Sequence, residues 1–196
     1  MDCKKVRKKL LAVGGIGSGT TELLYIFSED VKYEPETCLY IPAVFEPFVK
    51  EMRVDDQEFE LDLYDFSPNS VKKKFRPLQY PNTDIVLMCF STKIRESFKE
   101  VEDEWIPEVK QFCPDVLIVL VGNHTKRIED DFYHVDPSKI ETKVSTKEGR
   151  ELAKKIRAIC YMECCAKKKE GLIEIFDTAA RAALHGRPKK KRCIIQ

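Results

Sequence analysis

A glycine-rich segment near the N-terminus contains the residues with the clearest chemical potential. The segment Gly14-Gly15-Ile16-Gly17-Ser18-Gly19-Thr20-Thr21 follows a short apolar run and precedes a stretch with helical spacing. It matches the phosphate-binding pattern GxxxxGK[ST], except that Thr20 stands at the lysine position. In such a loop the backbone amides and the helix N-terminus surround a phosphate. The alternative is a tight glycine turn, which the missing lysine favours. The candidate phosphate-binding residues are Gly14, Gly17, Ser18, Gly19, Thr20 and Thr21.

The elements that must position this loop alternate between strand and helix periodicity. The predicted strands are 10–13, 58–63, 85–90, 116–121 and 160–164, and the predicted helices are 20–28, 97–112, 147–158 and 171–184. Strands that alternate with helices predict an α/β fold, with a mostly parallel sheet covered by helices on both faces. Ligands of such sheets bind at the carboxyl ends of the strands. We therefore expect functional residues in the loops after Val13, Leu63, Val121 and Cys164.

Composition limits the possible classes of protein. The chain has 196 residues, 43% of them hydrophobic, and 34 basic against 33 acidic side chains, which suits one globular domain. It has no run of 18 apolar residues and no signal-peptide pattern, so we expect a cytoplasmic protein with reduced thiols. Nothing outside the basic tail suggests nucleic-acid binding, and no pattern predicts an oligomer.

Five colinear stretches resemble the Rho subfamily of Ras-like small GTPases. They are YIPAVFEPF (40–48), LQYPNTDIVLMCFS (78–91), WIPEVKQFCPDVLIVLVGN (105–123), YMECCAK (161–167) and the terminal CIIQ. The resemblance implies a small-GTPase (P-loop) fold with a six-stranded sheet and a helical insertion near 127–145. It also implies a switch that binds GTP or GDP with Mg²⁺ and controls actin through effectors.

The sequence departs from this family where phosphate and metal are expected to bind. Thr20 replaces the lysine that neutralises the β- and γ-phosphates, and a charge-assisted bond is worth about 1.5–3 kcal/mol. Ala43 replaces a threonine that binds magnesium and senses the γ-phosphate. Thr21 and Asp65 remain as expected magnesium ligands.

Hydrolysis is expected to be impaired for two reasons. Pro68 replaces a glycine whose N–H binds the γ-phosphate, and proline has no N–H. Asn69 replaces the catalytic glutamine that orients the attacking water, and it is one methylene shorter. A misplacement of roughly 1 Å can cost about 10²-fold in rate.

Base recognition is also altered. The segment Asn123-His124-Thr125-Lys126 replaces the NKxD motif, and Lys126 offers only donors where the family aspartate accepts bonds from guanine. His124 can still stack on a purine, and an alternative role for Lys126 is to supply the lost charge at a phosphate. Ala166 and Lys167 keep two positions of the SAK motif. The expected base-binding residues are Asn123, Lys126, Ala166 and Lys167.

Two segments retain the character of an interaction surface. The expected effector surface consists of Tyr40, Pro42, Val44, Phe45 and Glu46. The alternative is that Phe45 and Phe48 pack at a strand edge. Pro77, Leu78 and Tyr80 resemble the exposed apolar contacts of the switch II helix.

The last residues match a lipidation signal. Cys193-Ile194-Ile195-Gln196 fits C-a-a-X, and its terminal glutamine favours farnesyl over geranylgeranyl. The neighbouring basic run supplies the second signal that stable anchoring needs, although by itself it also fits a nuclear-import signal or a solvated tail. We expect a domain over residues 1–186, a polybasic tail over 187–196, and attachment to the cytoplasmic face of the plasma membrane.

Three functions remain open at this point. The first is a membrane-anchored Rho-like pseudo-GTPase that binds effectors, exchange factors or prenyl-binding chaperones as a monomer, with GTP/GDP and Mg²⁺ bound weakly or not at all. The second is a conventional switch with slow GTPase activity. The third is a decayed gene copy.

Overall fold

A computed structural model describes residues 6–29, 48–66, 68, 73–123 and 143–186. Its strands are β1 (Val6–Gly14), β2 (Phe48–Val54), β3 (Gln57–Phe66), β4 (Ile85–Ser91), β5 (Leu117–Asn123) and β6 (Cys160–Cys164). Its helices are α1 (Thr20–Glu29), η1 (Lys73–Gln79), α3 (Arg95–Glu100), η2 (Val101–Trp105), α4 (Ile106–Phe112), α5 (Thr146–Ile156), η5 (Ala166–Lys168) and α6 (Leu172–His185).

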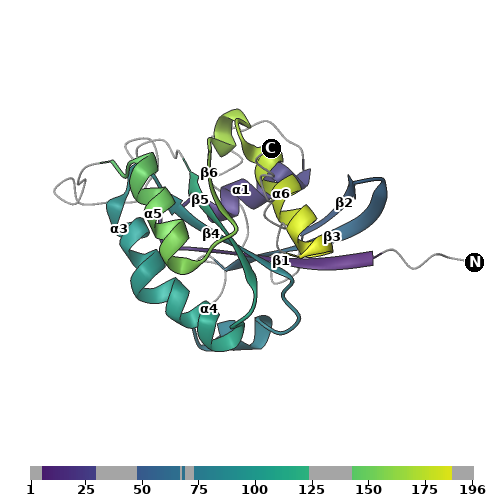
Figure 1. The fold of residues 1–196 in the computed structure, drawn as a ribbon, viewed down its shortest axis with the longest axis horizontal. Coiled ribbons are helices and arrows are strands. Elements are labelled where there is room, and N and C mark those ends of the chain that lie inside the picture. Colours follow the sequence, from purple (N-terminus) through teal and green to yellow (C-terminus); the bar gives the residue numbers. More distant parts are fainter. Residues whose placement is uncertain (1–5, 30–47, 67, 69–72, 124–142, 187–196) are drawn as a thin grey trace, which may run out of the picture.

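The six strands form one sheet in the order β2-β3-β1-β4-β5-β6 (Figure 1). β1 pairs in parallel with both β3 and β4, and β4, β5 and β6 continue in the same direction. β2 pairs antiparallel with β3, so the sheet is mixed. The predicted α/β fold with a mostly parallel sheet is confirmed. Most of the expected helical insertion lies outside the described residues.

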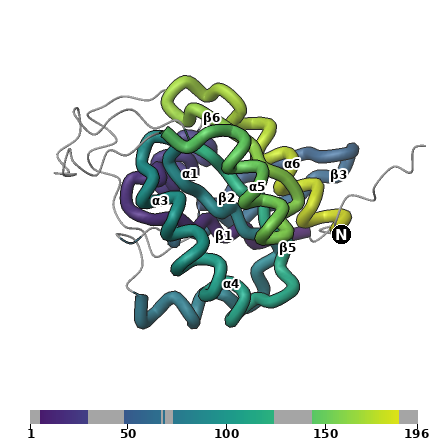
Figure 2. Tube along the Cα trace, turned by 60° about the vertical axis from the view of Figure 1, so that its left-hand side comes forward, coloured from purple at the N-terminus to yellow at the C-terminus, as the bar shows by residue number. Residues whose placement is uncertain are grey.

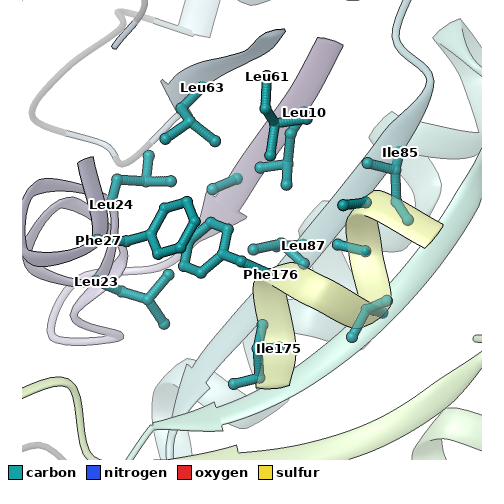
Figure 3. Close-up of a cluster of buried hydrophobic side chains, with 14 of the residues drawn as sticks. Leu10, Leu23, Leu24, Phe27, Leu61, Leu63, Ile85, Leu87, Ile175 and Phe176 are labelled. Carbon is teal, nitrogen blue, oxygen red and sulfur yellow. The ribbon is translucent and has the colours of Figure 1, made fainter. Parts of the chain in front are cut away.

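Hydrophobic side chains fill both faces of the sheet, as the continuous apolar runs predicted. One core lies under α1 and α6, where the rings of Phe27 and Phe176 stack with centroids 3.6 Å apart (Figure 3). The other core lies under α3, α4 and α5 and contains Trp105, Phe90 and Leu152. Figure 2 shows α3, α4 and α5 together on one side of the sheet. Burial on both faces fixes the strand ends that carry the candidate site.

The predicted helix over 97–112 is continuous but changes its winding. η2 is a π-helical turn, and the backbone N–H of Ile106 donates to the carbonyl of Val101, five residues earlier. Pro107 follows at the start of α4 and has no N–H to donate to the preceding turn. The wider π-helical turn thus ends two residues before this proline. No helix within the described residues is long and apolar enough to span a bilayer.

Candidate functional site

Loops from four parallel strands meet at the carboxyl edge of the sheet, as expected. After β1, the hydroxyl of Thr21 donates to Asp65 Oδ2 near the end of β3 at 2.5 Å. At the end of β5, Asn123 Nδ2 donates to the carbonyl of Ser18 at 3.3 Å. After β6, the backbone N–H of Ala166 donates to Asn123 Oδ1 at 3.5 Å. Among the described residues, these contacts bring together members of the predicted phosphate, metal and base sets, namely Ser18, Thr21, Asp65, Asn123 and Ala166.

The phosphate loop, residues 14–21, turns sharply between β1 and α1. The backbone N–H of Ser18 donates to the carbonyl of Gly15 at 3.1 Å, and Leu23 N–H donates to Gly19 at 2.9 Å. Gly17 and Gly19 have φ values of 77° and 74°, which favour glycine over residues with a Cβ atom. The backbone therefore has the glycine-rich turn before a helix that suits an anion.

Thr20, at the lysine position of this loop, turns its side chain inward. It is 1% exposed, and its hydroxyl lies 2.7 Å from that of Ser18, which is also 1% exposed. A Cβ atom on Gly14 would lie 2.5 Å from Thr20 Oγ1, so the glycine leaves the space that this side chain occupies. Thr20 thus supplies no charge to a phosphate, and its hydroxyl is engaged within the protein.

A carboxylate that the sequence analysis did not single out lies against the same loop. Glu100, at the end of α3, occupies the space in which a Cβ atom on Gly15 would lie. Burial raises the pKa of Glu100, and the neighbouring carboxylates of Glu104 and Glu96 raise it further. The next loop residue, Ile16, is 55% exposed. Glu100 lies in a helical stretch that showed no chemical pattern, so its contact with the loop depends on tertiary packing.

The two expected magnesium ligands are adjacent and chemically suitable. A threonine hydroxyl and an aspartate carboxylate are oxygen donors of the kind that Mg²⁺ prefers. Within the described residues, no group of three histidine, cysteine, aspartate or glutamate side chains could hold a metal. Thr21 and Asp65 therefore fit a magnesium ion that takes its other ligands from water and phosphate. Thr20, in contrast, does not fit the role of a positively charged side chain that neutralises phosphate.

The base side of the site is organised around Asn123. Its side chain is 1% exposed, and its Oδ1 accepts bonds from Ala166 N–H and from the thiol of Cys164 at 3.6 Å. Burial raises the pKa of Cys164 to about 12, so this thiol stays protonated and can donate. Asn123 thus links the phosphate loop to the loop after β6.

Lys167 is held by a residue that the sequence analysis missed. Its Nζ lies 3.7 Å from Glu22 Oε1 on α1, and the two side chains are 11% and 15% exposed. The pair joins η5 to α1 beside the phosphate loop. Glu22 stands in the first turn of a predicted helix, where an acidic residue is common for reasons of helix capping, so its sequence position gave no specific signal.

The helix η1 combines an ionic inner side with exposed apolar residues. Arg76 Nη1 lies 3.0 Å from Glu104 Oε1 and 3.2 Å from Glu108 Oε2, and its guanidinium lies 4.3 Å from the centre of the Trp105 ring. Phe75 and Leu78 are 43% and 75% exposed.

The prediction for Tyr80 was wrong. We expected an exposed apolar contact, but its ring is 1% exposed and its hydroxyl donates to Glu108 Oε1 at 2.9 Å. Its ring also stacks on Phe112 and contacts Phe66 edge-on. In the sequence, Tyr80 lies two residues after the exposed Leu78, which favoured the same environment for both. Its burial depends on Phe66 of β3 and on Glu108 and Phe112 of α4, which are distant from it in the chain.

Other expected site residues lie outside the described part of the chain. They are Tyr40, Pro42, Ala43, Val44, Phe45, Glu46, Asn69, Lys126 and Cys193. Pro68 is described and half-buried. For the remaining positions the roles given above stay predictions.

Together, the mostly parallel sheet and the glycine loop before α1 define an α/β protein of the phosphate-binding-loop class. The particular family follows from comparison with known families. The model of the Ras family matches residues 9–185, and the chain belongs to this family. Ras-family proteins are small GTPases, which typically bind GTP or GDP with Mg²⁺ and act as signalling switches.

Proposed function

We propose that this chain is a Rho-like member of the Ras family that holds guanine nucleotide poorly and signals by binding partner proteins. The observation that carries the proposal is the inward, hydrogen-bonded side chain of Thr20. A lysine at this position would place a positive charge against the phosphates. A buried hydroxyl that is already hydrogen-bonded to Ser18 does not supply this charge.

The expected loss of affinity is large because two subsites are affected. A charge-assisted bond contributes about 1.5–3 kcal/mol, so the lysine-to-threonine difference alone weakens binding roughly 10- to 100-fold. Lys126 stands at the position of the guanine-binding aspartate. Its ammonium group has only hydrogen-bond donors, so it cannot accept the hydrogen bonds that guanine donates. If each change costs about 2–3 kcal/mol, affinity falls by roughly 10³–10⁴.

Catalytic turnover is proposed to be weak for independent reasons. Pro68 removes the backbone donor that a glycine supplies, and the amide of Asn69 is shorter than that of glutamine. Restoring nucleotide binding is therefore not expected to restore hydrolysis. The chain would then act by binding partner proteins through its surface rather than by hydrolysing GTP.

The proposed partners are Rho effectors, exchange factors or prenyl-binding chaperones linked to the actin cytoskeleton. Their contact surface would include η1, where Phe75 and Leu78 expose apolar area next to Lys73 and Lys74. The segment with Tyr40, Pro42, Val44, Phe45 and Glu46 is proposed as the rest of this surface. An exposed apolar pair beside basic residues suits a partner with an apolar contact and an acidic rim.

Membrane attachment is part of the proposal. Residues 1–186 would form the domain, and residues 187–196 a basic tail prenylated at Cys193. A single lipid binds a membrane weakly, and basic residues near an anionic leaflet add about 1 kcal/mol each. Incorporation of labelled isoprenoid by the full chain, and its loss in C193S, is the expected result.

The content of nucleotide in purified protein tests the central proposal. We expect far less than one guanine nucleotide per chain by chromatography of the denatured protein. The double variant T20K/K126D should recover tight binding while still hydrolysing slowly. Near-stoichiometric GDP or GTP in the unmodified protein, or equal affinity in the two proteins, would contradict the proposal.

A second candidate function is a working but slow GTPase. The contact between Thr21 and Asp65 favours it, because the two expected magnesium ligands that the sequence retains are adjacent. Its signature would be magnesium-dependent GTP hydrolysis that D65A abolishes. Absence of turnover, even with a GTPase-activating protein, would exclude this candidate.

A further inference from the structure

The interior of the phosphate loop contains a pair of hydroxyl groups with an unusually closed environment. Ser18 Oγ and Thr20 Oγ1 lie 2.7 Å apart, and both residues are 1% exposed. Each hydroxyl has one donor and two acceptor sites, so one of the two groups donates to the other, and either can be the donor. We call these two residues the hydroxyl pair.

Three neighbouring elements enclose the hydroxyl pair. An added Cβ atom on Gly14 would lie 2.5 Å from Thr20 Oγ1, 2.6 Å from Ser18 Oγ and 2.8 Å from the carbonyl oxygen of Cys89 on β4. Asn123 on β5 donates to the carbonyl of Ser18 at 3.3 Å. The hydroxyl pair therefore lies against the ends of β1 and β4, and the backbone of Ser18 is hydrogen-bonded to β5.

A lysine side chain does not suit this interior position. Its ammonium group has three donors and no acceptor, and burying a charge without an anion is costly. A threonine hydroxyl has the size and the mixed donor and acceptor character that Ser18 requires. The residue at position 20 is thus matched to contacts inside the loop rather than to a ligand outside it.

We propose that the hydroxyl pair holds the phosphate loop in shape from within, so that the loop keeps its fold independently of bound phosphate. Ser18 and Thr20 are then positioning residues. This inference rests on the proposed function, since it explains how a member that binds nucleotide poorly keeps an ordered site.

Hydrogen exchange of loop amides tests the inference on the full chain, stripped of nucleotide in the presence of EDTA. The reporters are the Ser18 amide, which donates to Gly15, and the Leu23 amide, which donates to Gly19. We expect S18A and T20V each to speed their exchange about tenfold or more, because a buried hydroxyl loses its partner. T20S keeps the hydroxyl and should retain the parental protection.

Two further variants distinguish an effect of the hydroxyl pair on loop exchange from a general loss of stability. Thr83 donates its hydroxyl to the carbonyl of Tyr80 at 2.7 Å, away from the loop, so T83V should leave the exchange of Ser18 and Leu23 within about twofold of the parent. S18A/T20V removes both partners and should exchange no faster than either single variant. Single-variant effects no larger than that of T83V, or additive effects in the double variant, would overturn the inference.

The nucleotide content of the same preparations distinguishes the two proposals. Suppose that the protein carries stoichiometric nucleotide before stripping, and that the double variant exchanges no faster than either single variant. This result would overturn weak nucleotide binding and support the role of the hydroxyl pair in holding the loop. Absence of nucleotide, together with additive exchange effects in the double variant, would support weak nucleotide binding and overturn the proposed role of the hydroxyl pair.

Discussion

The hydroxyl pair of Ser18 and Thr20 is neutral, whereas a second buried polar group, the Arg76 cluster, is ionic. The Arg76 cluster consists of Arg76, Tyr80, Glu104 and Glu108, and it joins η1 to η2 and α4. The Arg76 side chain is 5% exposed, and both of its carboxylate partners belong to the same chain. Its charge is therefore compensated whenever the protein is folded.

The phosphate loop differs because the partner of a charge at position 20 would be a ligand. A buried charge that loses its partner is strongly destabilising. In the protein without nucleotide, a lysine at this position would be a charge without a partner, whereas the hydroxyl of Thr20 is neutral and hydrogen-bonded to Ser18. In the Arg76 cluster, by contrast, both partners of the buried charge are supplied by the protein itself.

The largest expected effect comes from breaking the Arg76 cluster. R76M keeps an apolar stem against Trp105 but leaves Glu108, whose side chain is 11% exposed, without its buried cation, while Glu104 keeps its contact with Lys73. We expect a loss of about 3–5 kcal/mol in the free energy of unfolding, measured by urea denaturation.

Lys73 provides the matched control for this experiment. It also contacts Glu104, at 3.3 Å, but its side chain is 73% exposed. K73M should cost no more than about 1 kcal/mol. If R76M were as mild as K73M, the buried cluster would contribute little, and the contrast with the hydroxyl pair would lose its basis.

A smaller effect is expected from placing a charge in the phosphate loop. T20K should raise GDP affinity roughly 10- to 100-fold, measured with a fluorescent nucleotide, because it restores a charge-assisted bond. In the stripped protein the same variant should lower the free energy of unfolding by about 1–3 kcal/mol, because Ser18 loses its partner.

T20M separates the charge from the change in size. Methionine also removes the hydroxyl but supplies no cation, so the stripped protein should lose stability without a gain in affinity. An equal gain in affinity for T20M and T20K would show that charge at position 20 is not what limits nucleotide binding.

Much of the fold was predictable because burial on two faces leaves a strong pattern. The apolar runs at 85–90 and 116–121 became β4 and β5, and the glycine loop lies between β1 and α1 as expected. β2 was not predicted as an element of its own. Its inward face carries Phe48, Lys50 and Met52, and the charged Lys50 interrupts the apolar alternation that would have predicted a strand. Lys50 is accommodated on this face because its ammonium group lies over the Phe27 ring.

The candidate site was predictable in its position but not in its internal contacts. Parallel strands bring Asp65, Asn123 and the loop after β6 to one edge, which follows from topology alone. The direction of the Thr20 side chain and the contact of Glu100 with Gly15 depend on how α3 and β4 pack, and local sequence does not encode them. The ion pair of Glu22 with Lys167 joins residues far apart in the chain and had no local signal either.

The smallest expected effect concerns an ionic contact that is internal but accessible to water. Glu148, in the capping box of α5, accepts bonds from the backbone N–H and hydroxyl of Ser145 and from Arg95 Nη1 at 2.8 Å. The bond from Arg95, followed by those from Ser145, lowers the pKa of Glu148 to about 2. Its side chain is 35% exposed, so solvent screening limits the stabilisation to about 1 kcal/mol.

The pH dependence follows from the sign of this shift. Because the folded pKa is lower than the unfolded value near 4.5, the contribution is complete above that value and disappears as pH falls towards about 2. E148Q should therefore be less stable than the parent at neutral pH, and the two should converge in acid. E151Q, whose carboxylate is 62% exposed and 4.0 Å from Lys147, should match the parent throughout. A cost for E148Q as large as that for R76M would mean that burial does not set the value of an internal ion pair here, and the contrast between the two clusters would have to rest on geometry instead.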